Sequence, residues 1–312
     1  VAGALPKALF DRGIDVRVVM PLYAGIPWND LERLDGMLPV PMWWGTAKSA
    51  VRLGRLPGSK VPTYFVEYNQ YFDRPYLYGP PGDGYPDNVE RFTFLSRASL
   101  QLCKAIGFMP DVVHANDWQT ALLPVYLNTV EWAQPLHASA SVYTIHNLAY
   151  QGVSDGGGMF ITGLGREHYT PAEFEHFGAL NLTKGALVHS TMLSTVSPTY
   201  GREIQTCAYG FGLDGVLTRR KGDLRGILNG IDVDEWDAMR DPHLPAPFSI
   251  ARLAGKATCK AALQKEAGLP VRADVPVFGV IGRLTEQKGF DILAHSLERV
   301  LGWNCLLYTS DA

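Results

Sequence analysis

A histidine and an asparagine, His146 and Asn147, directly follow a short run of β-branched and aromatic residues at positions 142–145. Because this run is apolar, short and closed by polar residues and glycine, it predicts a buried strand. In a parallel α/β sheet, ligands bind beyond the carboxyl ends of the strands, so the pair is a candidate ligand-binding site. The alternative is that His146 is a structural histidine, hydrogen-bonded to the backbone of its loop.

A second stretch has the same design. Residues 111–119, D-V-V-H-A-N-D-W-Q, predict a short strand, a polar cluster and the start of a helix. One interpretation of Asp117 is that it caps this helix, because aspartate is preferred at that position for structural reasons. The other is that its carboxylate faces the same crevice as His146, since both strands end at the same edge of the sheet.

Two cations, Arg283 and Lys288, lie between a predicted strand at residues 275–281 and a predicted helix whose apolar face begins at Phe290. Side-chain cations and the free N–H groups of a helix start together form an anion site that suits a diphosphate. The alternative is a solvated loop in which the charges pair with each other, Arg283 with Glu286 for example.

A long loop rich in tyrosine, proline and glycine is predicted at residues 71–88, and it contains Tyr78. Loops of this length inside a compact domain tend to be functional. Aromatic rings and restricted proline dihedrals would suit a rigid wall for a sugar ring. The alternative is a surface loop that its own side chains pin in place.

Short strands and helices alternate in a way that would position these residues. Strands are predicted at residues 16–20, 63–68, 142–145 and 193–196, with antiparallel strands and loops at residues 23–62. The alternation predicts at least four βα repeats before about residue 221, which is typical of a parallel sheet covered on both faces. A second sheet is predicted to begin at residues 224–228 and to continue through a helix at residues 254–267.

Composition restricts the class of protein. The chain has 312 residues, 46% hydrophobic and 19% charged, which is typical of a globular protein with about two domains. A formal net charge of -3 and a pI near 6.3 argue against nucleic acid and anionic membrane as partners. The four cysteines are far apart and form no cluster at metal-ligand spacing, which predicts free thiols and no metal site. No apolar run approaches the roughly 18 residues that span a bilayer.

Eight stretches occur in a characteristic order: V-A-G-A-L-P-K-A-L, Y-P-D-N-V-E-R-F, D-V-V-H-A-N-D-W-Q-T-A-L, T-I-H-N-L-A-Y-Q-G, S-T-V-S-P-T-Y-G-R-E-I, Y-G-F-G-L-D-G-V-L, G-I-L-N-G-I-D and G-R-L-T-E-Q-K-G-F-D. In these stretches the sequence resembles the bacterial glycogen synthase and plant starch synthase family. The resemblance implies the GT-B architecture, an α/β fold of two Rossmann-like domains with parallel sheets. It implies an N-terminal acceptor-side domain at residues 1–222 and the start of a nucleotide-sugar-binding domain at residues 223–312.

The resemblance also implies an activity, the transfer of glucose from ADP-glucose to the non-reducing end of an α-1,4-glucan with retention of configuration. His146 matches a histidine beside the donor sugar, where it would hold the glucose and the developing charge. Arg283 and Lys288 match residues that bind the donor diphosphate as it leaves, so that neither a metal nor another cofactor is required. The remaining matched positions would line the cleft and contact substrate: Asp117, Asn147, Asn229 and Tyr78. The implied location is the cytoplasm, or the plastid in a plant.

The sequence departs from the family pattern in several places. The family's K-x-G-G-L donor loop and its first strand would precede Val1, and later acidic and glycine-rich motifs are missing, so the second domain is predicted to be incomplete. Gln119 stands where many relatives have histidine, and the last eight residues do not follow the family. We therefore expect a fragment that is inactive alone. Two alternatives stay open, a GT-B glycosyltransferase that uses UDP-glucose and a non-catalytic glucan-binding protein; a dehydrogenase is disfavoured because no G-x-G-x-x-G follows a strand.

Overall fold

The chain folds into two compact units in a computed structural model that describes residues 2–284 and 286–310. The first unit is Val1–Gly230 and the second is Ile231–Ala312. The predicted boundary between residues 222 and 223 is corrected, because strand β12 (Leu224–Gly226) pairs in parallel with strand β11 (Met192–Thr195) of the first unit. The strand at residues 224–226, predicted to open the sheet of the second domain, is therefore an edge strand of the parallel sheet in the first unit.

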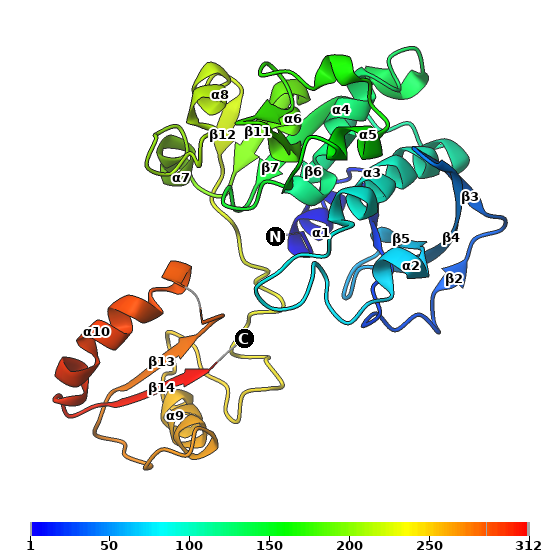
Figure 1. Ribbon diagram of the computed structural model, residues 1–312. Coiled ribbons are helices and arrows are strands. Elements are labelled where there is room, and N and C mark those ends of the chain that lie inside the picture. The colour runs from blue at the N-terminus through cyan, green and yellow to red at the C-terminus, as the bar shows by residue number, and fades with distance from the viewer. Residues whose placement is uncertain (1, 285, 311–312) are drawn as a thin grey trace. The chain divides into compact units, whose positions relative to one another are not determined.

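A four-stranded sheet in the first unit has the order β12-β11-β7-β6, and all of its pairs are parallel. Strands β6 (Val112–Asn116) and β7 (Ala140–Ile145) contain the predicted strands that precede Asp117 and His146. Between these strands in the chain lie helices α4 (Leu122–Asn128), α6 (Leu182–His189), α7 (Pro198–Glu203) and α8 (Asp214–Arg219). The predicted parallel α/β architecture is confirmed for this part of the chain (Figure 1).

A second sheet of the first unit is mixed. Strand β1 (Val18–Pro21) pairs in parallel with β5 (Pro62–Glu67), and β5 pairs antiparallel with β4 (Gly45–Arg55). Strands β2 (Glu32–Arg33) and β3 (Leu38–Met42) pair antiparallel with β4, as predicted for residues 23–62. The strands before residue 221 therefore belong to two main sheets and not to one, because the antiparallel hairpins attach to β5.

One helix, α3 (Asn88–Ala105), contributes to the hydrophobic cores beside both sheets. Phe92, Phe94 and Ala98 pack in the core that contains β3, β4 and β5. Val89 and Leu100 pack in the core of the parallel sheet. The helix contacts β3 and β1 on one side and α4 and α5 (Gly158–Thr162) on the other (Figure 1).

The remaining described elements of the first unit are short. They are α1 (Ala4–Phe10), α2 (Asn69–Phe72), the 3-10 turns η1 (Trp118–Thr120), η2 (Pro135–Ala138) and η3 (Arg166–His168), and a small antiparallel sheet of β8 (Val153–Ser154), β10 (Ala179–Asn181) and β9 (Glu175–His176).

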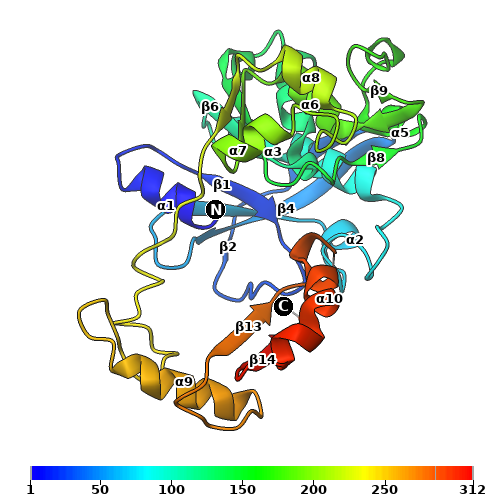
Figure 2. The same ribbon diagram turned by 90° about the vertical axis from the view of Figure 1, so that its left-hand side faces the viewer.

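The second unit has a two-stranded parallel sheet of β13 (Val277–Ile281) and β14 (Leu306–Ser310). Helices α9 (Gly255–Glu266) and α10 (Phe290–Leu301) lie on opposite sides of it, as both views show (Figures 1 and 2). The short turn η4 (Glu286–Lys288) leads into α10. No described helix in either unit is long and apolar enough to cross a membrane.

The loop between α2 and α3 is held by a buried arginine. The guanidinium of Arg91 is fully buried and donates hydrogen bonds to the carbonyl of Tyr71 at 2.7 Å, to Oδ1 of Asn88 at 2.6 Å and to the carbonyl of Leu77 at 3.0 Å. Burial lowers the pKa of Arg91 from its ordinary value. A side chain of α3 therefore fixes the path of the loop.

Replacing Arg91 should destabilise the first unit. In Arg91→Leu, three acceptors lose their donor, one of them in a fully buried hydrogen bond, which should lower the free energy of unfolding by about 3 kcal/mol. Urea denaturation of the chain measures the loss. Arg12→Leu, at an exposed position, is the matched control and should stay within about 0.5 kcal/mol of the parent. Equal stability of the two variants would show that Arg91 does not hold the loop.

Candidate active site

The carboxyl ends of β6 and β7 bring Asp117 and His146 together. Oδ1 of Asp117 accepts a hydrogen bond from the backbone N–H of His146 at 2.8 Å and lies 3.4 Å from the N–H of Asn147. The Asp117 side chain makes no capping bond to the turn η1 that follows it. The capping interpretation is therefore wrong, and the carboxylate instead accepts from the backbone that follows β7.

Asp117 has an unusual backbone conformation. Its φ is 54° and its ψ is −177°, a region that non-glycine residues rarely adopt. Such strain costs on the order of 1–3 kcal/mol and persists only where the surroundings impose it. The Asp117 N–H donates to the carbonyl of Thr144 on β7 at 3.0 Å. Both backbone and side chain of Asp117 are thus committed to the neighbouring strand.

The imidazole of His146 is oriented by a side chain of β6. Its Nε2 lies 2.9 Å from Oδ1 of Asn116. Because an amide oxygen can only accept, Nε2 is assigned as the donor and Nδ1 is left as an acceptor. An imidazole held in this tautomer can accept a hydrogen bond from a sugar hydroxyl.

The loop after His146 is shaped by local and tertiary contacts. Oδ1 of Asn147 accepts from the N–H of Ala149 at 3.0 Å, which makes a tight turn. The hydroxyl of Tyr200 accepts from the N–H of Leu148 at 3.1 Å. Gly152 has a φ of +64°, and a Cβ there would overlap the ring of Trp118. Asn147 and Gly152 thus determine the path of the loop that carries His146.

Tyr78 lies in the loop before α3. Its ring packs on Phe92 with centroids 6.1 Å apart, and its side chain stays 46% exposed. Burial raises the pKa of Tyr78, and the charge of Asp117 raises it further. Burial also raises the pKa of Tyr23, with a contribution from Tyr78. The side chain of Tyr78 is thus held against Phe92 but stays partly open to solvent.

Asn229 lies three residues after β12 and is exposed. The N–H of Ile227 still donates to the carbonyl of Thr195 on β11 at 2.8 Å, so the chain leaves the sheet at the same edge as β7. Asn229 thus follows the carboxyl end of a strand of the parallel sheet and not of the second sheet that the sequence predicted there.

Arg283 and Lys288 lie in the second unit, between β13 and α10. Lys288 ends η4, and its aliphatic stem lies against Gly282. Gly289, with a φ of 73°, is the N-cap residue directly before α10. Both cationic side chains are exposed. The alternative in which Arg283 pairs with Glu286 rests on a side chain outside the described part of the structure.

The fold is of the GT-B class, and comparison with known proteins agrees. The structure matches the catalytic domain of starch synthase IV from Arabidopsis thaliana, bound to ADP and acarbose, with a TM-score of 0.91 and 31% identity over 98% of this chain and 63% of that one. A family model, the starch synthase catalytic domain, matches residues 1–219. The chain belongs to this family.

Curated relatives are similar over nearly the whole chain. Glycogen synthase 1 of Geobacter sulfurreducens is 52% identical over 305 residues, which cover 96% of this chain and 61% of the relative. The glycogen synthase of Anaeromyxobacter dehalogenans strain 2CP-C is 47% identical over 303 residues, with 96% and 63% covered. The chain thus spans about three-fifths of the length of these relatives. The predicted family and fold class are confirmed.

The ionisation of Asp117 should make stability depend on pH. Burial raises the pKa of Asp117 above its ordinary value of 3.8, although the N–H groups of His146 and Asn147 act in the opposite direction. The folded protein therefore holds this proton more tightly than the unfolded chain does. Stability from this group is complete below pH 3.8 and is lost as the pH rises through the folded value.

Asp117→Asn tests this dependence, because the amide oxygen can still accept from His146 but cannot titrate. The free energy of unfolding of Asp117→Asn, relative to the parent, should rise with pH across this window. Urea denaturation at a series of pH values measures it, with Asp35→Asn at an exposed position as the control. A constant difference between variant and parent would contradict the direction of the shift.

Proposed function

We propose that the protein of which this chain is a part transfers glucose from ADP-glucose to the non-reducing end of an α-1,4-glucan, with retention of configuration. The observation that carries the proposal is the contact of the Asp117 carboxylate with the backbone of His146 and Asn147 at the carboxyl edge of the parallel sheet. Family membership supports the reaction class. The names of the relatives, and the ADP and acarbose in starch synthase IV, support the donor and the acceptor.

The first unit would bind the glucose. His146, with Nε2 engaged by Asn116, presents Nδ1 to a hydroxyl of the transferred sugar, and its ring can stabilise charge that develops there. The exposed ring of Tyr78 would contact a sugar face, and Asn147 and Asn229 would line the same edge. Asp117 would contribute mainly by holding the backbone that carries His146.

The second unit would bind the diphosphate. As the glucosyl bond breaks, negative charge builds on the departing ADP, and cations placed there in advance lower the barrier. Arg283 and Lys288 follow β13 and precede α10, where free N–H groups add to the positive potential. Because two cations can offset this charge, we propose a reaction that needs neither a metal nor a cofactor beyond the nucleotide sugar. We also propose that the protein acts in the cytoplasm, without nucleic acid or membrane partners.

The chain spans about three-fifths of the length of the relatives. The test therefore uses a chimera that has the full length of a relative. The parts of Geobacter sulfurreducens glycogen synthase 1 outside the matched residues would flank this chain. Labelled ADP-glucose and UDP-glucose are offered in parallel with glycogen, and glucoamylase digestion checks the new linkages. Incorporation from ADP-glucose supports the proposal. Preference for UDP-glucose, or glycogen binding without transfer, would support the alternatives.

Removing the imidazole should affect turnover more than nucleotide binding. In His146→Ala of the chimera, kcat for transfer should fall by about 10²-fold, since the ring acts on the sugar and not on the diphosphate. Calorimetric ADP affinity should change far less. His243→Ala, at an exposed position, is the control. A fall in ADP affinity as large as the fall in kcat would argue against a sugar-side role.

Removing a cation should affect both turnover and ADP binding. In Lys288→Ala and Arg283→Ala, we expect losses of roughly 2–4 kcal/mol in transition-state stabilisation, together with weaker ADP binding. Steady-state kinetics and calorimetry on the chimera measure the two effects. Lys265→Ala changes an exposed lysine on α9 and should leave both unchanged. Unaltered ADP affinity in Lys288→Ala would contradict the diphosphate assignment.

A further inference from the structure

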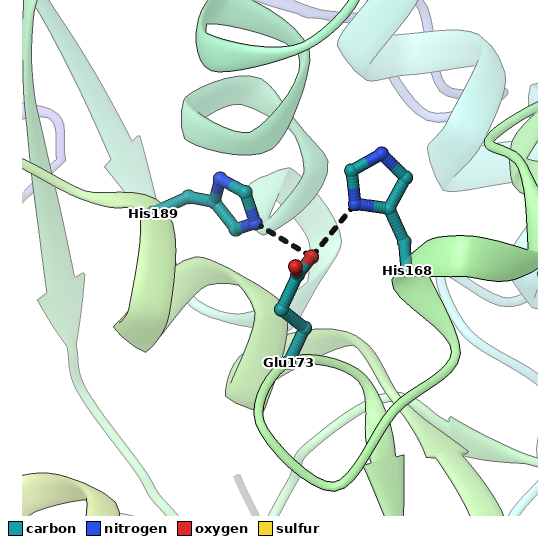
Figure 3. Close-up of side chains that lie close together, drawn as sticks. All are labelled: His168, Glu173 and His189. Carbon is teal, nitrogen blue, oxygen red and sulfur yellow. Dashed lines mark hydrogen bonds and ion pairs between the residues drawn. The ribbon is translucent and has the colours of Figure 1, made fainter.

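Three metal-ligating side chains converge in the first unit, apart from the candidate active-site residues. Nδ1 of His168 lies 2.7 Å, and Nε2 of His189 lies 3.1 Å, from the same oxygen of Glu173, Oε2. The three ligand atoms all lie within 4.8 Å of one another. Figure 3 shows both imidazoles pointing at the carboxylate. We name His168, Glu173 and His189 the His-Glu-His cluster.

The cluster joins three separate pieces of the chain. His168 ends η3, Glu173 lies in the loop before β9, and His189 is the last residue of α6. The carbonyl of His189 accepts from Nδ2 of Asn128 at 2.6 Å, which anchors this end of α6.

Contacts outside the cluster hold its loop against α6. Phe174, next to Glu173, is fully buried, and its ring lies so close to Gly185 of α6 that a Cβ there would overlap it. Nζ of Lys184 donates to the carbonyl of Pro171 at 2.7 Å and also to that of Glu175. The ligand positions are therefore set before any ion binds.

The donor set suits zinc. Two imidazole nitrogens and one carboxylate form a set that zinc sites use, with one position left for water. Bonds of about 2.0–2.2 Å in a tetrahedron separate the ligand atoms by about 3.3–3.5 Å. The two recorded separations are 2.7 and 3.1 Å. They are shorter than the tetrahedral separation by roughly 0.2–0.8 Å, so both imidazoles must move away from Glu173 to admit an ion.

Access and charge also agree with an ion. The side chains of His168, Glu173 and His189 are 21%, 26% and 13% exposed, which leaves an opening for an ion and a water. A glutamate carboxylate is ordinarily ionised near neutral pH, as a metal ligand must be.

We propose that His168, Glu173 and His189 bind one zinc ion, with water as the fourth ligand, and that the ion fastens residues 163–178 to the end of α6. The site is independent of glucosyl transfer. Since the loop is already packed on α6, the ion adds stability to a chain that folds without it.

The test is zinc binding to the 312-residue chain after chelator dialysis, by calorimetry, with cobalt absorption as a probe of tetrahedral coordination. We expect one saturable ion per chain and a rise of several degrees in Tm. His168→Gln, Glu173→Gln and His189→Gln should each weaken binding by at least about tenfold, since even the loss of an outer-shell partner costs that much. His243→Gln and Cys207→Ser, both at exposed positions, should bind like the parent.

His189→Cys separates coordination from folding. A thiolate can replace imidazole as a zinc ligand, so this variant should keep zinc binding although the imidazole hydrogen bond to Glu173 is lost. Circular dichroism of the metal-free variants verifies that each is folded before titration. The proposal is overturned if the parent shows no saturable zinc binding, or if the three glutamine variants bind zinc as the parent does.

Discussion

The burial of helix α3 on two sides is the constraint on which the rest of the first unit depends. Phe92 and Ala98 pack toward the mixed sheet, whereas Val89 and Leu100 pack toward the parallel sheet. A helix buried on both sides cannot move without opening apolar surface in two cores at once. Trp118 packs against both cores and directly follows Asp117 in the chain. The hydrophobic packing thereby imposes the position from which the Asp117 carboxylate reaches the neighbouring strand.

Polar contacts then turn this packed frame into a site. A carboxylate partly removed from water accepts from the N–H groups at the end of β7, and Asn116 orients the ring of His146. These groups hold one another through backbone and amide atoms, so no substrate is needed to arrange them. The left-handed backbone of Asp117 costs energy that the two cores supply. His146, which would contact sugar, is therefore positioned by Asn116 and Asp117.

Much of this arrangement could be predicted from local patterns. Apolar runs closed by polar residues located β7, and the general rule for parallel sheets then placed His146 at an edge. The role of Asp117 stayed open, because a helix cap and a crevice carboxylate call for the same residue type. The sheet to which β12 belongs depends on pairing with β11, which no local pattern encodes. The His-Glu-His cluster is likewise formed by tertiary packing, since His168 and His189 are separated by twenty residues that match no ligand motif.

The loop before α3 is held in place through its backbone carbonyls, so its path does not depend on the side chains that it exposes. Arg91 holds the carbonyls of Tyr71 and Leu77, and the amide of Asn88 donates to the carbonyl of Tyr78. Since every residue type has these carbonyls, the path of the loop places little demand on which side chains it displays. The side chains of Leu77 and Tyr78 are about half exposed. Substitutions can therefore change the displayed side chains without rebuilding the fold beneath them.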